Sequence, residues 1–87
     1  MSIAFSKIES YKYLFGDNIK RIRESKSLSQ FDLASLVNDI TESSKFDKTS
    51  ISRIENGRTN ITLTTAIKLA LALEVEPKEL FDFKTSK

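Results

Sequence analysis

The 87-residue sequence contains no histidine, cysteine or tryptophan, and it has only two glycines and one proline. Without cysteine, a disulfide, a thiolate nucleophile and a cysteine-ligated zinc site are all excluded. Without histidine, the commonest general base and metal ligand is missing as well. No carboxylate, hydroxyl or lysine pair stands in a recognisable catalytic motif. We therefore expect a protein that is not an enzyme and that carries no metal and no cofactor.

Long hydrophobic runs are also missing. The longest, Leu69–Leu73, is far shorter than the roughly 20 residues that a bilayer span requires. The first residues lack the basic run and the apolar stretch of a signal peptide. We expect a cytoplasmic protein with no membrane partner and no small-molecule ligand.

What the chain does contain is enough apolar sequence for a compact core. Hydrophobic residues make up 39% of it and charged residues 30%, which excludes a disordered chain. A domain of this size buries only roughly 60% of the surface that its unfolded chain exposes, so its stability is marginal. The composition predicts one small domain that gains from dimerisation.

The net charge is only +2, with a sequence pI of about 9.0, but the charges are unevenly distributed. Residues 1–26 carry +3, residues 27–44 carry −3, residues 45–68 carry +3 and residues 69–87 carry −1. Two basic blocks can form one positive face on a folded domain, as nucleic-acid binding requires. A well-mixed surface is the alternative interpretation.

Apolar residues at a spacing of three or four predict helices along most of the chain. From Ile8 to Ile22 they predict one or two helices ending near Lys26, with Gly16 as a possible break. Ser29 starts a capping box for a second helix, whose buried side we expect to include Phe31. Asp47 is a good N-cap for a third helix.

The third helix is predicted from Lys48 to about Asn56, with Gly57 as the left-handed residue after it. A fourth helix begins at Leu63, and Pro77 suits the start of a short fifth helix. The prediction is an all-α domain of five helices over residues 15–83, with an extra N-terminal helical segment over 1–14 and a tail over 84–87.

Four stretches, taken in order, resemble a known family. They are Phe15-Gly16-x-x-Ile19-x-x-Ile22-Arg23-Glu24, Leu28-Ser29-Gln30-x-x-Leu33-Ala34, Ile51-Ser52-Arg53-Ile54-Glu55-Asn56-Gly57-Arg58, and Ala66-Ile67-x-Leu69-Ala70 continuing to Leu80-Phe81. Together they resemble the phage-repressor-type helix-turn-helix family, the Cro/C1/XRE group, over residues 15–83. This group includes phage-type repressors and restriction–modification controller proteins. Its fold is a five-helix DNA-binding domain, in agreement with the helices predicted above.

The resemblance implies roles for individual residues. The helix over 48–56 becomes the recognition helix, which lies in the major groove with its first residues at the base edges. Its outward side supplies the expected base contacts: Lys48, Thr49, Ser52 and Arg53. The expected phosphate contacts are Gln30, Asn56, Arg58, Thr59 and Asn60. The resemblance also implies a structural salt bridge between Arg23 and Glu55.

The chain departs from the family between the two helices of the motif. Residues 38–44 form an insertion of about seven residues, and Lys45 replaces the usual glycine of the turn. Three explanations are open: a longer first motif helix, a loop bulging into solvent, or a contact with the DNA backbone through Ser43, Ser44 or Lys45. Phosphate would repel Asp39 and Glu42, which favours the bulge.

The function that these features favour is a sequence-specific, double-stranded-DNA-binding transcriptional regulator, acting as a homodimer on a two-fold operator. The expected dimer interface is Ile61, Leu63, Leu80, Phe81 and Phe83. The N-terminal residues are too apolar for a free tail and are expected to pack against the domain or a second subunit. The alternative is an antitoxin-like or protein-interaction module that keeps the fold without operator recognition.

Overall fold

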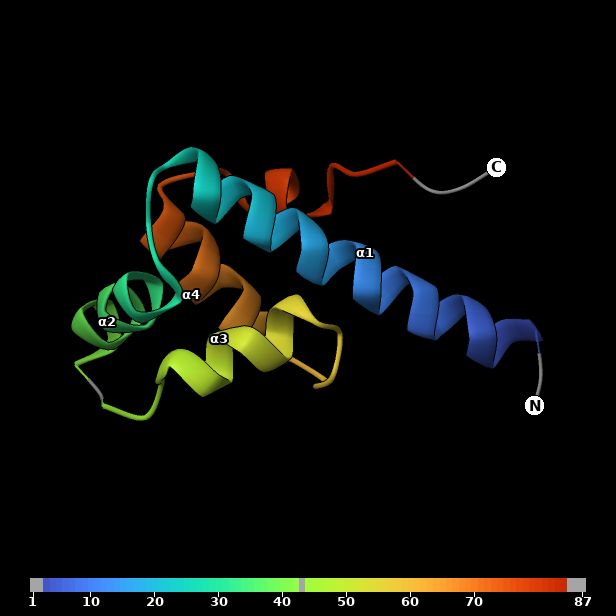
Figure 1. Cartoon of the computed structure of the whole chain (residues 1–87), viewed down its shortest axis with the longest axis horizontal. Helices are drawn as coiled ribbons and strands as arrows, with labels where there is room; N and C mark the ends of the chain where they lie inside the picture. The colour runs from blue at the N-terminus through green and yellow to red at the C-terminus, as the bar shows by residue number, and fades with distance from the viewer. Residues whose placement is uncertain (1–2, 43, 85–87) are drawn as a thin grey trace.

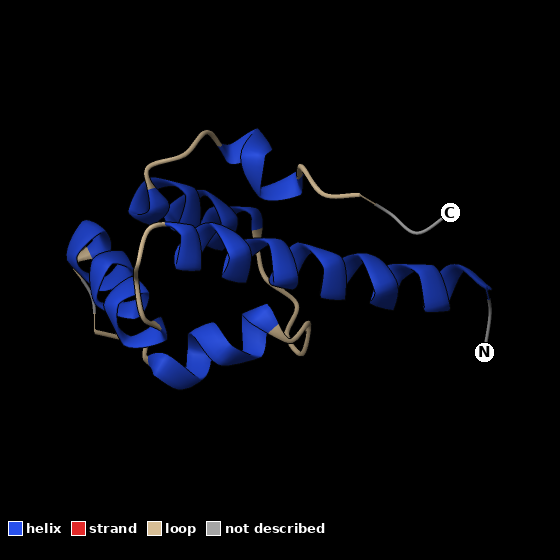
Figure 2. Cartoon of the chain, turned by 45° about the horizontal axis from the view of Figure 1, so that its top comes forward, coloured by secondary structure: helices blue, strands red, loops and turns tan. Residues whose placement is uncertain are grey.

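The computed structural model describes residues 3–42 and 44–84, and within this part of the chain the only regular elements are helices, joined by loops (Figure 1, Figure 2). Its elements are α1 (Ile3–Ser25), α2 (Gln30–Thr41), α3 (Lys48–Glu55), α4 (Leu63–Leu73) and the 3-10 helix η1 (Pro77–Phe81). The all-α class is confirmed. The number of helices differs from the prediction, because the described residues form four α-helices and the fifth element is a 3-10 helix. Residues 1, 2 and 85–87 of the predicted ends lie outside the described residues.

Helix α1 runs without interruption through Gly16, so the predicted break there is wrong, and the segment up to residue 14 is the first part of α1 rather than an extra element. Gly16 serves a close approach between helices instead. A Cβ on Gly16 would lie 2.3 Å from the Ile54 carbonyl oxygen and 2.7 Å from that of Glu55. The backbone of α1 can therefore touch the last turn of α3 only where a side chain is missing.

The core is built where α2, α3 and α4 meet α1 and η1. Its buried apolar residues are Ile19, Leu33, Ala34, Val37, Ile51, Ile54, Ala66, Leu69, Ala70, Ala72, Leu73 and Leu80. Each fully buried Leu or Ile of this set contributes on the order of 1.5–3 kcal/mol relative to an exposed side chain. One side of α3 therefore packs on the core, and its opposite side faces solvent.

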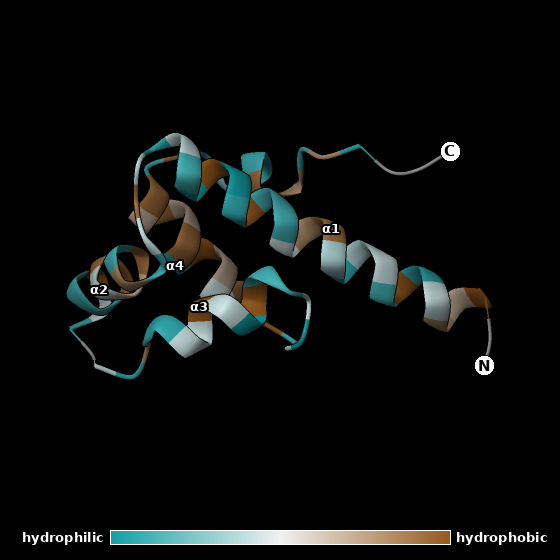
Figure 3. Ribbon diagram, in the orientation of Figure 1, coloured by the Kyte–Doolittle hydropathy of each residue, from teal (hydrophilic) through white to brown (hydrophobic). Residues whose placement is uncertain are grey.

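Several large apolar side chains lie outside the core, among them Phe31, which was expected on a buried side. Phe31 is exposed because it lies two residues, or about 200° of helical rotation, from the buried Leu33. Leu63 and Leu71 are also exposed. With Ile67 they form a second stripe at a spacing of four residues, and all three side chains are exposed. Figure 3 shows how strongly apolar α4 is.

The N-terminal half of α1 projects beyond the rest of the molecule in both views (Figure 1, Figure 2). The longest dimension is accordingly 40 Å, against 23 and 19 Å in the other directions. The side chains of Ile3, Phe5, Ile8 and Tyr11 remain exposed on this part of the helix. The expected helix is present, but these side chains do not become buried within one chain.

The insertion between α2 and α3 begins as helix. Because α2 continues to Thr41, residues 38–41 add a helical turn, and Glu42 ends the helix in the left-handed region at φ 51°. The expectation that the whole insertion bulges is therefore wrong, since only the part after Thr41 is a loop. Ser43, one of the proposed backbone contacts, lies outside the described residues.

A side-chain staple closes this loop. The Asn38 amide donates to the Phe46 carbonyl oxygen at 2.8 Å, and the Phe46 backbone N–H donates to the Asn38 carboxamide oxygen at 3.0 Å. The half-buried Phe46 ring packs against the core. Both ends of the loop are thus held together, so that α3 starts from a defined position.

Candidate nucleic-acid interface

Helix α3 begins and is oriented through its own sequence. The Asp47 carboxylate accepts a hydrogen bond from the Ser50 backbone N–H at 2.8 Å, and the Ser50 hydroxyl oxygen accepts one from the Asp47 backbone N–H at 3.3 Å, which makes a capping box. Ile51 and Ile54 are buried beneath it. The 3.6-residue period then directs the opposite side of the helix to solvent.

The four predicted base-contact residues all lie on that outward side. Lys48, Thr49 and Arg53 are exposed and Ser52 is half-buried. Among the described residues, the side chains of Lys48 and Arg53 form no ion pair and no hydrogen bond. A short helix thus presents an ammonium group, a hydroxyl with a methyl group, and a guanidinium fork side by side, all available to a ligand. These are groups that distinguish base edges in a major groove.

A buried ion pair fixes the last turn of α3 to α1. Arg23 Nε donates to Glu55 Oε2 at 2.6 Å and Arg23 Nη2 to Glu55 Oε1 at 3.0 Å, so the pair is bidentate, as the resemblance implied. Both side chains are almost fully buried. The hydrogen bonds from Arg23 to Glu55 raise the pKa of the guanidinium further above its ordinary value. Arg23 also donates to the Leu28 carbonyl oxygen at 2.8 Å, which ties in the turn before α2.

Gln30 joins this pair, a role that the sequence did not indicate. Its side-chain amide donates to Glu55 Oε1 at 3.1 Å. The expected phosphate-binding residue at the start of α2 therefore also holds α3. A carboxamide nitrogen carries two N–H donors, so the second one is available to another acceptor. The ion pair and Gln30 together connect α1, α2 and α3 at one point.

The remaining residues predicted to contact phosphates lie at the end of α3 and in the segment that follows it. Gly57 has φ 68°, in the left-handed region as predicted, and the Arg58 backbone N–H closes the turn onto the Arg53 carbonyl oxygen at 2.9 Å. The Asn56 side chain donates to the Ser52 carbonyl oxygen at 2.8 Å and so caps the helix. The Arg58 side chain is exposed directly after this turn, followed by the half-buried Thr59 and the exposed Asn60.

Asn18 is a structural residue that the sequence reasoning missed. It is 2% exposed, and its amide donates to the carbonyl oxygens of Glu79 and Leu80, both at 2.9 Å. These bonds fasten η1 to α1, because they satisfy two carbonyl groups at the end of the chain's last helical element. The sequence did hold a sign of this role, because Asn18 is a polar residue on the apolar side of α1, between Phe15 and Ile22.

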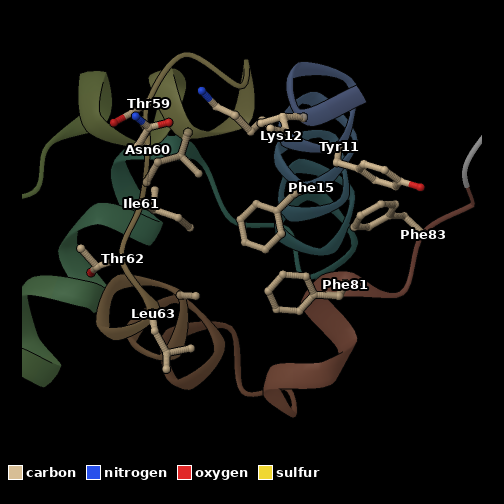
Figure 4. Close-up of a pocket in the computed structure, with 13 residues that line it drawn as sticks. Tyr11, Lys12, Phe15, Thr59, Asn60, Ile61, Thr62, Leu63, Phe81 and Phe83 are labelled. Atoms are coloured by element: carbon tan, nitrogen blue, oxygen red, sulfur yellow. The ribbon is translucent and has the colours of Figure 1, made fainter. Parts of the chain in front are cut away.

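The predicted dimer residues separate into two groups. Leu80 is completely buried in the core, so its assignment to a dimer interface is wrong: it stabilises the single chain. Ile61, Leu63, Phe81 and Phe83 instead line one open groove of about 560 Å³ between α1, the segment after α3 and the C-terminal residues (Figure 4). Thr59 and Asn60 lie at the end of this groove next to α3. The groove and the outward side of α3 are thus separate surfaces that meet at residues 59 and 60.

Within residues 3–42 and 44–84, no helix has the length and apolar character needed to cross a bilayer.

Comparison with known proteins identifies the family. Residues 19–80 match the family model described as helix-turn-helix. The chain is 40% identical over 75 residues to the control protein C.BamHI of Bacillus amyloliquefaciens, covering 85% of this chain and 84% of that one. It is 34% identical over 71 residues to the control protein C.MunI of a Mycoplasma species, covering 80% and 86%.

A solved structure is similar as well. The restriction-modification controller protein C.AhdI from Aeromonas hydrophila matches with a TM-score of 0.73 and 34% identity, covering 84% of this chain and 96% of that one. These relatives are regulatory proteins and not enzymes. The chain therefore belongs to the Cro/C1-type helix-turn-helix family, as a DNA-binding regulator of the restriction–modification controller type.

Proposed function

We propose that this protein is a cytoplasmic, sequence-specific transcriptional regulator that binds a two-fold operator as a homodimer and controls restriction–modification genes. One observation carries the proposal: the outward side of α3 presents Lys48, Thr49 and Arg53 to solvent, while the buried Arg23–Glu55 pair fixes the helix. Specific recognition needs side chains held in a defined position, because each hydrogen bond to a base depends on direction.

Each side chain has a distinct part in reading the bases. Arg53 donates two hydrogen bonds to the O6 and N7 atoms of a guanine, and Thr49 hydrogen-bonds a base edge or packs its methyl group on a thymine. Lys48 reaches a guanine or a phosphate from the first turn. Ser52 is half-buried, and its short side chain contacts a base edge only where the helix lies close to it.

Phosphate contacts on both sides of α3 set its position along the duplex. On one side, the backbone N–H groups at the start of α2 and the second N–H of Gln30 face an anion. On the other, the exposed Arg58 is supported by Asn56, Thr59 and Asn60. The two sites bracket the recognition helix, so that one copy covers one half-site. Two copies would then read half-sites about one helical turn apart, roughly 34–36 Å.

The direct experiment selects bound sequences from a random duplex pool with the purified protein. We expect a palindromic site, whose affinity falls by roughly 10³–10⁵ between 50 and 200 mM salt if the dimer makes 6–10 phosphate contacts. Arg58→Ala should weaken binding to the selected site. Lys20→Ala, which removes an exposed cation on α1 outside the proposed interface, is its control and should leave binding unchanged. Failure to enrich any sequence, or binding insensitive to salt, would contradict the proposal and favour a protein-interaction module.

A further inference from the structure

Lys12 is the one charged residue among those described as lining the groove. Its side chain is 27% exposed, and its ammonium lies 3.5 Å from a carboxylate oxygen of Glu9 on the same helix. No other ionic partner of Lys12 occurs within residues 3–42 and 44–84. The Glu9 side chain is itself 45% exposed, and a surface pair of this kind contributes little to stability. The ammonium can therefore exchange Glu9 for a stronger anion.

The backbone of α1 at Lys12 is held against the turn that follows α3. A Cβ on Gly57 would lie 3.0 Å from the Cα atom of Tyr13 and 3.3 Å from the carbonyl carbon of Lys12. Because Gly57 belongs to the turn directly after α3, this contact fixes the backbone of Lys12 relative to that helix. The flexible four-carbon stem of the lysine therefore starts from a defined position beside α3.

The Lys12 side chain points to the segment that carries the proposed phosphate contacts. In Figure 4 its ammonium is directed toward the segment with Thr59 and Asn60, which line the groove together with Lys12. The exposed Arg58 directly precedes them and has no ionic partner among the described residues. Two cations, a hydroxyl group and a carboxamide therefore lie at one edge of the molecule, with Glu9 as the acidic group beside them.

We propose that Lys12 is a further DNA-contacting residue: its ammonium leaves Glu9 and binds a backbone phosphate of the duplex that lies on α3. The inference rests on the proposed operator binding and adds α1 to the elements that contact the DNA. A duplex on the outward side of α3 passes its backbone across residues 58–60, where the groove meets that side, and the ammonium is directed to the same place. Lysine suits this role because it binds a phosphate as a point charge and reads no base.

The test measures the affinity of the full chain for its selected operator at several salt concentrations. Lys12→Met keeps an unbranched side chain in the groove and removes its charge. We expect it to weaken binding at least about fivefold at roughly 0.1 M salt, and to lower the slope of log affinity against log salt by roughly 0.9 for each protomer. Lys12→Arg should return both quantities to nearly the wild-type values, because the charge is restored.

Lys7→Met is the matched control. Lys7 is an exposed cation on the same projecting half of α1, and the helical period turns it about 140° away from Lys12. The two variants have the same net charge, so a difference between them reports the local contact and not the charge of the whole molecule. Lys7→Met should change the affinity by less than about twofold and leave the salt slope unchanged.

Equal affinities and salt slopes of the wild type and Lys12→Met would overturn the phosphate contact while leaving the proposed function in place. Weaker binding with an unchanged slope would overturn it too, since Lys12 would then act through the packing of the groove. A wild type that enriches no operator would overturn the proposed function and this inference with it. A slope that falls in Lys12→Met, returns in Lys12→Arg and stays unchanged in Lys7→Met supports the inference.

Discussion

The Asn38 carboxamide pairs with both backbone polar groups of Phe46, eight residues further along the chain. The pairing explains how a helix-turn-helix motif accommodates a longer connection. The additional residues extend α2 by a turn and form a loop, while Asn38 and Phe46 keep the start of α3 next to the end of α2. The angle between the motif helices is then independent of how the loop itself is arranged.

Replacing Asn38 with alanine should therefore damage both stability and recognition. Two hydrogen bonds disappear and the Phe46 backbone groups are left without their partner, so we expect a decrease of about 1–3 kcal/mol in the free energy of unfolding, measured with urea. Specific DNA binding should weaken with it. Asp39→Ala, at an exposed neighbour on the same added turn, should change stability by less than about 0.5 kcal/mol. If both substitutions lowered the free energy of unfolding equally, the two hydrogen bonds between Asn38 and Phe46 would not be what stabilises this connection.

Glu55→Gln tests the buried ion pair. The substitution preserves shape but leaves the Arg23 guanidinium buried without its counter-charge, which costs about 3–5 kcal/mol when one partner of such a pair is removed. Denaturant unfolding measures the decrease. Arg23→Met combined with Glu55→Leu should be less destabilising than Glu55→Gln, since no charge is left unpaired. If the double variant instead had the lower free energy of unfolding, the ion pair would stabilise the fold by more than the avoidance of an unpaired buried charge.

Gly16→Ala should reverse the usual effect of this substitution in a helix. Glycine to alanine normally stabilises an exposed helical position by roughly 0.5–1 kcal/mol. Here the added methyl group meets the Ile54 carbonyl oxygen at 2.3 Å, so we expect destabilisation of about 1–3 kcal/mol. Thermal unfolding compared with Ser10→Ala, an exposed site on the same helix, measures it. An increase in melting temperature would show that α1 does not touch α3 at this point.

Sequence reasoning succeeded where neighbours along the chain decide the structure. Ser29 and Asp47 marked the starts of α2 and α3, and Gly57 marked the left-handed residue after α3, because caps depend on residues within a single turn. It failed where distant contacts decide. Gly16 looked like a break because its partner, the end of α3, is far away in sequence, although the apolar period continued unchanged across it.

The site shows the same division. The outward side of α3 followed from the period of Ile51 and Ile54 alone, whereas the contact of Gln30 with Glu55 requires three helices to be in place. Leu80 was assigned to the surface because its short segment contains too few residues to show a period. Only the folded chain shows that it closes the core.

Acid should destabilise the protein through its helix caps. The backbone N–H of Ser29 lowers the pKa of Asp32, and that of Ser50 lowers the pKa of Asp47, both from 3.8. Because the folded-state pKa is the lower one, the caps stabilise the fold above pH 3.8, and this contribution disappears as the pH falls through the folded-state values.

Urea unfolding between pH 6 and pH 3 checks this dependence. Asp32→Asn combined with Asp47→Asn should lower stability at pH 6, and the difference from wild type should shrink as the pH falls. A constant difference over this range would show that the carboxylate charge at the caps has no part in stability.

The central claim, that the outward side of α3 reads bases while Arg58 holds a phosphate, is tested most directly by affinities for the selected operator and all its single-base variants. Arg53→Ala should reduce discrimination by about 1–3 kcal/mol at one position of each half-site and leave the other positions unchanged. Arg58→Ala should weaken binding to all sequences alike and reduce the salt slope by about one for each phosphate that is no longer neutralised. Unchanged discrimination at every position in Arg53→Ala would contradict the account.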